Sequence, residues 1–241
     1  MNEIIKITFV VSILGAISSG IGGIISSLFD LNNKKYISIL QQITAGIMTG
    51  IVCFDMLPEA FNISNVFFSL IGVIIGISVI YFLEELINKI NNKKYADKYI
   101  ISIVIMISMT FHNIIEGIAI GSSFSYSFSM GITVIIAIIL HDIPEGIVVG
   151  VSNNIAGKSK IRNIIGTIIV GIVTGFGAFL GGIVGNINEL FISLALSVAA
   201  GVMLYIISCE FMPNSYSIYS TKKINISYII GILLGAIIVY V

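Results

Sequence analysis

The sequence predicts an all-α, polytopic membrane protein with eight transmembrane helices. Of its 241 residues, 57% are hydrophobic and only 10% are charged, and the mean hydropathy is +1.09. Soluble domains carry roughly a quarter charged residues, whereas a bilayer core of about 30 Å needs roughly 20 apolar residues per helix. Eight apolar runs of that size use up almost the whole chain. We therefore expect a single transmembrane domain over residues 1–241, with no room for a soluble domain.

Polar connectors separate the apolar runs and so set the expected span limits. The first run begins after Lys6 and is longer than the roughly 7–15 residues of a signal-peptide core, so we expect it to be retained as a span. The last run is short and stops at the chain end. The expected spans cover residues 7–28, 36–57, 66–87, 99–121, 130–152, 163–185, 190–212 and 226–241.

The basic residues predict the orientation in the membrane. The connectors after spans one, three, five and seven carry Lys or Arg, and the other three connectors carry neither. Eleven of the twelve basic residues therefore fall on one side of the membrane, and only Lys6 falls on the other. Since basic loops stay in the cytoplasm, we expect both termini to be extracytoplasmic in a multi-pass protein of the cell membrane. A net charge of zero argues against a nucleic-acid partner, and the oligomeric state stays open, a homodimer included.

A short repeat carries the most unusual residues of the chain. The segments HNIIEGIAIG (112–121) and HDIPEGIVVG (141–150) are identical at six of ten positions, and they contain both histidines of the protein. In a helix, positions i and i+4 share a face, so His112 projects with Glu116 and His141 projects with Glu145. Spans four and five are antiparallel and joined by a short loop, which should place His112 level with Glu145. We expect all four side chains in one layer about 6 Å thick, near the middle of the bilayer.

This layer has the composition of a metal site. An ionised carboxylate at the centre of a membrane helix costs about 3 kcal/mol, and no Lys or Arg lies in any expected span to compensate it. Two imidazoles with two carboxylates suit Zn²⁺, Fe²⁺, Mn²⁺ or Co²⁺. Asn113 and Asp142 add oxygens on the flank, and Glu116 and Glu145 could bridge to a second ion. Pro144 frees the carbonyl of the residue four positions earlier, which in lipid needs a partner or a water-lined cavity.

Two other interpretations of the repeat stay open. A structural polar network could hold the helices together without any transport. An intramembrane metalloprotease is the second alternative, but that chemistry uses His-Glu-x-x-His on one helix, and neither repeat has a second His at the required position. We expect a transporter and no enzymatic activity or prosthetic group.

Further acids and sulfur ligands mark a candidate path toward the central layer. Asp55 and Glu59 lie at the predicted outer end of span two, and Cys209 and Glu210 lie at the predicted inner end of span seven. Each end has an acid three residues before a proline. We expect these four residues at the two mouths of the path, with Met48 as packing or as a soft accessory ligand. The alternative is that they are helix-end residues that reach the interface. Glu84 and Glu85 have lysines nearby and should form a solvated face.

At these residues the sequence resembles the ZIP (Zrt/Irt-like) family of divalent metal transporters, in particular its bacterial ZupT-like and GufA-like branches. The resemblance rests on HNIIEG, HDIPEG, AGIMTGIVCFDMLPEA in span two and AAGVMLYIISCEFMP in span seven. It implies a ZIP-type helix bundle with eight spans and both termini outside, and the import of zinc, and often iron, manganese or cobalt, into the cytoplasm. It also implies a binuclear site. The ligands His112, Glu116, His141 and Glu145 would hold one ion. Asn113, Asp142 and the two glutamates would hold the other.

Three departures from the family pattern matter for these expectations. Many relatives carry Glu-Pro in the sixth helix as a further ligand, where this sequence has Ala178 and Phe179. We therefore expect the second ion position to be weak or absent. The usual proline of the fourth-helix signature is Ile115, so that helix should be straighter. The cytoplasmic loop NKINNKKYADK lacks the histidines of many relatives.

Overall fold

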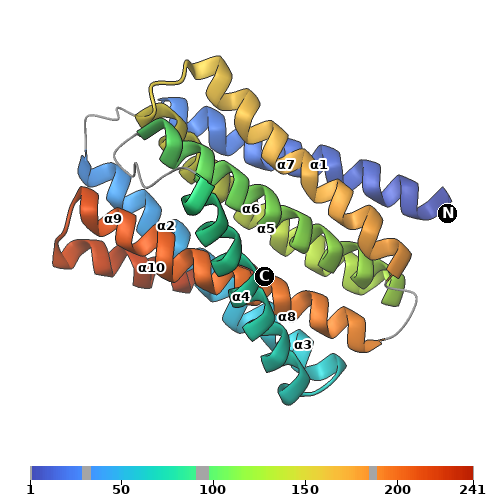
Figure 1. Ribbon diagram of the computed structural model, residues 1–241. Coiled ribbons are helices and arrows are strands. Elements are labelled where there is room, and N and C mark those ends of the chain that lie inside the picture. Colours follow the sequence, from blue (N-terminus) through green and yellow to red (C-terminus); the bar gives the residue numbers. More distant parts are fainter. Residues whose placement is uncertain (1, 29–33, 91–97, 185–188, 241) are drawn as a thin grey trace.

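The computed structural model describes residues 2–28, 34–90, 98–184 and 189–240, and this part of the chain is helical with short connections and no strand (Figure 1). Eight helical segments in it are long and apolar enough to cross a bilayer. The predicted all-α class with eight such helices is therefore confirmed. Two of these segments pass through a π-helical turn, so they consist of two α-helices each. The elements are α1 (Asn2–Leu28), α2 (Lys34–Ile51), η1 (Val52–Met56), α3 (Leu57–Ile63), α4 (Val66–Ile90), α5 (Lys98–Tyr126), α6 (Phe128–Ile155), α7 (Lys160–Val184), α8 (Glu189–Tyr205), η2 (Ile206–Phe211), α9 (Met212–Ile218) and α10 (Lys222–Tyr240).

The connection between α5 and α6 is shorter than the sequence predicts. The serine-rich stretch after residue 121 is mostly helical, and only Ser127 separates the end of α5 from the start of α6. Ser123 and Ser125 donate to carbonyl oxygens one turn back in α5, which allows serine to stay inside a helix. The Ser127 side chain accepts from the backbone N–H of Met130 at 3.1 Å and so caps α6. The tight turn fixes the register of the two helices that carry the repeat.

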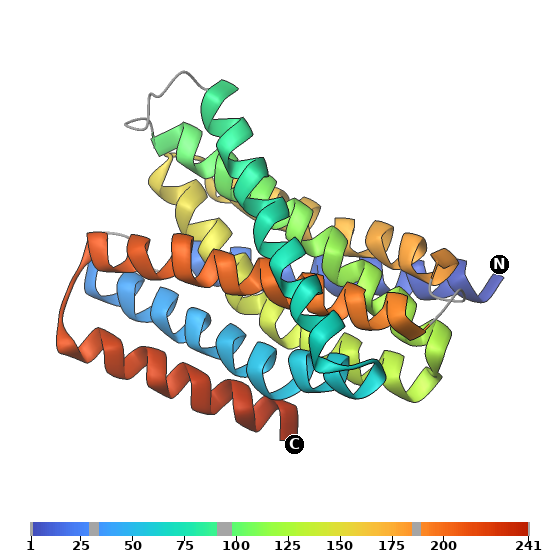
Figure 2. The same ribbon diagram turned by 60° about the horizontal axis from the view of Figure 1, so that its bottom comes forward.

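The helices form two bundles (Figures 1 and 2). In the first bundle, α1, α5, α6 and α7 pack on one another. In the second bundle, α2 packs on α10 and α9, and α8 packs on α4 and α3. The contacts between the two bundles are mainly those of α5 with α8 and of α2 with α6. The repeat residues lie on α5 and α6 and therefore belong to the first bundle, while both acid-x-x-Pro segments belong to the second.

Packing within a bundle differs from packing between the bundles. A Cβ on Gly171 of α7 would lie 2.1 Å from the carbonyl oxygen of Gly15 in α1, and one on Gly46 of α2 would lie 2.2 Å from that of Tyr228 in α10. Backbones thus touch inside each bundle, as small residues allow in lipid. Between the bundles lies an apolar cluster of long side chains, with Met109 of the first bundle and Met203 of the second fully buried in it.

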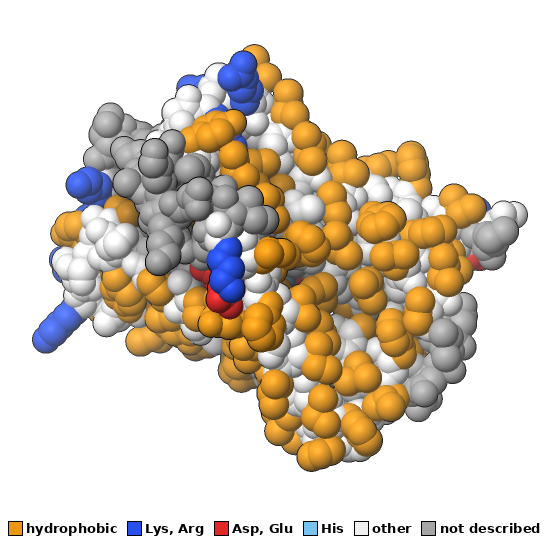
Figure 3. All heavy atoms as spheres, in the orientation of Figure 1, with side chains coloured by type: hydrophobic (Ala, Val, Ile, Leu, Met, Phe, Trp, Pro, Cys, Tyr) orange, Lys and Arg blue, Asp and Glu red, His pale blue; other side chains and the backbone are white. Residues whose placement is uncertain are grey.

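The outer surface is apolar and charged side chains gather at one end (Figure 3). We call this the basic end; Lys34 begins α2 here, Lys158 lies between α6 and α7, and Lys222 begins α10. The N-terminus and the α5–α6 turn lie at the opposite end (Figures 1 and 2). Broad apolar faces with charge at the end are what a bilayer-spanning protein requires.

A candidate metal centre in the first bundle

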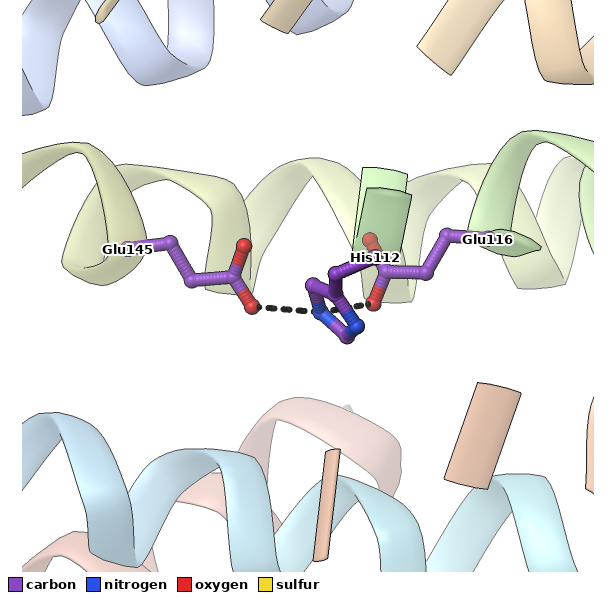
Figure 4. A group of neighbouring side chains, drawn as sticks. All are labelled: His112, Glu116 and Glu145. Atoms are coloured by element: carbon purple, nitrogen blue, oxygen red, sulfur yellow. Dashed lines mark hydrogen bonds and ion pairs between the residues drawn. The ribbon is translucent and has the colours of Figure 1, made fainter. Parts of the chain in front are cut away.

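Three side chains of the repeat converge between α5 and α6 (Figure 4). The Nε2 atom of His112 lies 3.0 Å from Oε1 of Glu116 and 3.0 Å from Oε1 of Glu145. One ligand atom from each residue falls within 4.8 Å of the other two. The relative exposures of His112, Glu116 and Glu145 are 0%, 0% and 2%. The centre is therefore closed to both ends of the protein in this structure.

The local sequence explains this convergence. His112 and Glu116 are one helical turn apart on α5, so their side chains share a face. Glu145 comes from the antiparallel helix α6 at the same level, as expected from the short turn between the helices. Donors that bind one Zn²⁺ lie about 2.0–2.2 Å from it, and separations of 3.0 Å between such donors need only small adjustments. Two carboxylates around one imidazole leave the centre with excess negative charge that a divalent cation would compensate.

The remaining repeat residues are placed differently. The side chain of His141 lies outside the described part of the structure, although its backbone belongs to α6. Asp142 is buried and accepts a hydrogen bond of 3.1 Å from the hydroxyl of Ser18 in α1. Asn113 is buried and donates to the carbonyl oxygen of Val170 in α7 at 3.0 Å, while its Oδ1 has no hydrogen-bond partner among the described residues. These two side chains thus link the centre to the flanking helices.

Close helix packing surrounds Ala178, the position at which the sequence resemblance led us to look for a further ligand. Ala178 is 1% exposed, and its carbonyl oxygen would lie 2.1 Å from a Cβ on Gly121 of α5. A Cβ on Gly117 would meet its backbone nitrogen at 2.8 Å. The short side chain and the two glycines allow α7 to lie against α5. A larger side chain at position 178 would have to fit into this tight backbone packing.

A cavity with acids opens between the bundles at the end opposite the basic end. Its volume is about 310 Å³, and its walls come from η1, α3 and the ends of α5 and α6. Asp55 and Glu59 line it together with hydroxyl groups of the α5–α6 turn. These hydroxyl-bearing residues, which the sequence interpretation did not single out, are Tyr126, Ser127, Ser129 and Thr133.

A second cavity opens between the bundles toward the basic end, with a volume of about 210 Å³. It is lined by Cys209 and Glu210 of η2, by Glu84 of α4 and by Val148 of α6, among others. Val148 follows Glu145 by three residues, which is one helical turn, or about 5 Å. Only a thin layer of side chains thus separates the metal centre from this cavity.

Glu84 corrects one expectation from the sequence. Glu85 lies on a solvated face, as expected, and forms an exposed ion pair of 2.9 Å with Lys89. Glu84 instead accepts a hydrogen bond of 2.5 Å from the hydroxyl of Tyr205 in α8 and lines the cavity near Glu210. The helical period separates these neighbours by about 100°, so adjacent acids face different surroundings. Ser18 was likewise not expected, because a single serine in an apolar helix gives no signal of its own.

Met48 lies in the apolar cluster between the bundles. Its side chain is fully buried, and the same cluster contains Met203 and Val148. Met48 and Met203 occupy matching places seven residues before the acids Asp55 and Glu210. In the structure Met48 therefore packs at the surface where the bundles meet.

Comparisons with known proteins show the family to which the chain belongs. A family model described as ZIP zinc transporter matches residues 89–241, which is more than half of the chain and includes both copies of the repeat. A comparison with curated proteins gives no match. Together with the eight membrane-crossing helices, the family match identifies a multi-pass membrane protein. The chain belongs to the ZIP zinc transporter family, whose members transport divalent metal ions.

Proposed function

We propose that this protein imports divalent transition-metal ions, zinc first among them, across the cell membrane into the cytoplasm. Fe²⁺, Mn²⁺ and Co²⁺ are the other substrates that this donor set accepts. The observation that carries the proposal is the convergence of His112, Glu116 and Glu145 in a buried centre within a bilayer-spanning bundle. His141, Asn113 and Asp142 complete the proposed ligand set, with Asn113 and Asp142 serving a second, weaker position.

The two cavities support a path through this centre. In the proposed orientation the basic end faces the cytoplasm, and both termini face outward. A metal ion would then enter at Asp55 and Glu59 and leave at Cys209 and Glu210. Both cavities lie between the bundles, and the thioether of Met48 between them is a candidate soft ligand for an ion in passage.

The packing supports alternating access by movement of one bundle against the other. Transporter sites near the membrane midplane often work in this way. Backbone contacts at glycine make each bundle stiff, whereas flexible methionine and aliphatic side chains fill the surface between them. A sliding surface of this kind can repack without breaking hydrogen bonds of the helix pairs within a bundle.

Uptake into proteoliposomes loaded with a zinc-sensitive dye tests the proposal. Wild-type protein should give a zinc-dependent signal, and Glu116→Gln and Glu145→Gln should each lower the rate by at least about tenfold, since each removes a charge from the centre. Glu116→Ala with His141→Ala should abolish the signal. Glu85→Gln is the matched control, because this exposed acid is paired with Lys89, and it should keep the wild-type rate.

The alternatives give different results in the same system. A protein with only a structural polar network would show no zinc-dependent signal in any variant. A metalloprotease would cleave an added membrane substrate, whereas the proposed transporter leaves it intact. Competition of Fe²⁺, Mn²⁺ and Co²⁺ with zinc, measured in wild type and in Asp142→Ala, would then rank the substrates and show whether Asp142 discriminates among them.

A further inference from the structure

A lysine is built into the cytoplasm-facing end of the bundle that carries the metal centre. Helix α6 ends at Ile155, and Gly157 follows with a φ of +77°. The backbone N–H of Gly157 donates to the carbonyl of Asn154, and that of Lys158 donates to the carbonyl of Asn153. This is the Schellman arrangement, in which glycine takes the left-handed position. It fixes the backbone of Lys158 against the last turn of α6.

The side chain of Lys158 folds back onto the bundle. Its ammonium nitrogen lies 2.7 Å from Oδ1 of Asn153, 3.0 Å from the hydroxyl of Ser102 and 3.3 Å from the sulfur of Met106. It also lies 5.6 Å from the centre of the Tyr99 ring. The first three contacts match the three N–H bonds of an ammonium group. All four partners are neutral, so these contacts hold the positive charge in place without cancelling it.

A buried amide network extends this contact across the bundle. Asn153 donates to Oδ1 of Asn163 at 3.3 Å, and Asn163 donates to the hydroxyls of Ser26 at 3.2 Å and Ser27 at 3.0 Å. Together with the contact of Lys158 to Ser102, the network joins α1, α5, α6 and α7 on the side of the metal centre that faces the basic end. Burial lowers the pKa of Lys158 from its usual value near 10.5, because removal of water disfavours the charged form.

The distance to the metal centre is short on the scale of electrostatics. Asn153 follows Glu145 by eight residues, or about 12 Å along α6. We propose that Lys158 is a fixed positive charge that weakens metal binding at His112, Glu116 and Glu145, and so keeps the affinity low enough for release. This inference rests on the function proposed above and adds a residue that sets its affinity. The contacts of Lys158 are with Asn153, Ser102, Met106 and Tyr99 and not with His112, Glu116 or Glu145, so Lys158 acts on these three residues through space.

The size of the effect follows from Coulomb's law. A half-buried ammonium and a divalent ion about 12 Å apart, at an effective dielectric constant of about 40, repel enough to change a dissociation constant about tenfold. The change is about threefold if the metal displaces one proton, because the charge added on binding is then halved. Removal of the Lys158 charge should therefore tighten zinc binding by about three- to tenfold.

Equilibrium zinc binding to the purified full-length protein tests this inference. Lys158→Gln should bind zinc about three- to tenfold more tightly than wild type and release it more slowly. Lys158→Arg keeps the charge and should bind as wild type does. Lys160→Gln is the matched control, because it removes an exposed charge two residues away, where water and salt screen it, and it should change the dissociation constant less than twofold. A purely structural role of Lys158 predicts weaker binding or lower stability, never tighter binding.

A second variant covers the case in which Lys158→Gln does not fold. Asn153→Asp keeps the size of the side chain and places a carboxylate beside the ammonium, and it should tighten binding in the same direction. The inference is overturned if folded Lys158→Gln or Asn153→Asp binds zinc as wild type does or more weakly. If wild-type protein binds no zinc, or if Glu145→Gln does not weaken binding, the proposed function itself fails, and the two failures are thus distinguished.

Discussion

Asp142 shows how a neighbouring helix decides the direction of a functional side chain. It follows His141 in the repeat, yet its carboxylate is drawn toward α1 by the hydroxyl of Ser18. The Ser18 hydroxyl also lies within hydrogen-bond distance of the carbonyls of Leu14 and Gly15. A buried carboxylate that loses a donor of this kind is destabilised by about 1–3 kcal/mol.

Ser18→Ala should therefore lower the thermal stability of the protein in detergent and change metal selectivity through Asp142. The expected loss is about 1–3 kcal/mol, read as a shift in the melting temperature, with competition uptake as the second measurement. Ser12→Ala is the control, because the Ser12 hydroxyl donates to Thr8 within the same helix. Equal behaviour of the two variants would contradict a role for Ser18 at Asp142.

Glu84 is a second residue whose surroundings suggest a role in transport. It lines the cavity with Glu210 and accepts a hydrogen bond from Tyr205. Glu84→Gln should leave zinc affinity at the buried centre within about twofold, because Glu84 is not in the ligand group, and should lower the uptake rate severalfold by removing a negative charge from the exit. Glu85→Gln again serves as the control. A weaker affinity with an unchanged maximal rate would assign Glu84 to the centre instead.

At the scale of elements, the contact between α1 and α7 depends on glycine. Gly15 and Gly171 face each other, and a methyl group on either would meet the other's backbone oxygen. Neither backbone can move aside without separating the helices. The small-residue pattern in the sequence is thus a packing device of the first bundle, as it is for α2 with α10.

Gly171→Ala should destabilise the protein by about 1–3 kcal/mol through overpacking. Gly166→Ala in the same helix is the matched control, because its new methyl group would meet only side chains, the flexible end of Met106 at 3.2 Å and the amide nitrogen of Asn153 at 3.3 Å. That substitution should cost clearly less than Gly171→Ala, since no backbone atom is met and alanine is a better helix former than glycine. Thermal unfolding of both variants checks the difference, and a stable Gly171→Ala protein would mean that α1 and α7 can separate.

The two π-helical turns form a matched pair of elements. Each interrupts a long helix of the second bundle, at Val52–Met56 and at Ile206–Phe211. Each contains an acid, Asp55 or Glu210, and ends two residues before a proline. π-turns within α-helices are frequently found at functional sites. The first lies at the cavity with Asp55, and the second lies at the cavity with Glu210. The similar local sequences therefore produce similar irregular turns at opposite ends of the molecule.

At the scale of the whole molecule, the proposed transport mechanism requires that the two bundles can move relative to each other. Val148 of the first bundle and Cys209 of the second line the same cavity. In a Cys53→Ser background, a short bifunctional thiol reagent joining Val148→Cys to Cys209 should abolish zinc uptake. Protein carrying Val148→Cys without the reagent should retain uptake.

A cross-link inside one bundle is the control for this experiment. The Ser38 hydroxyl lies 2.9 Å from the backbone oxygen of Ser215, and α2 and α9 belong to the same bundle. In protein without native cysteines, a disulfide between Ser38→Cys and Ser215→Cys should leave uptake unchanged. Transport that survives the link between the bundles would show that the ion passes without their relative movement.

The sequence by itself determined the class of fold and the core of the candidate centre. Hydropathy sets the eight helices, because backbone polar groups in lipid can be satisfied only within regular structure. The spacing of His112 and Glu116 sets their common face, and the short turn sets Glu145 at their level. These features depend on local periodicity, which a single sequence displays directly.

The tertiary structure decided what local periodicity does not contain. The division into two bundles, the link from Asp142 to Ser18, the position of Glu84 at a cavity and the fixed charge of Lys158 all depend on which helix lies beside which. Ser18 and Asp142 are separated by 124 residues. The sequence shows no relation between them because the contact is created by packing of α1 on α6, and packing is set by the whole set of surfaces that the chain must bury.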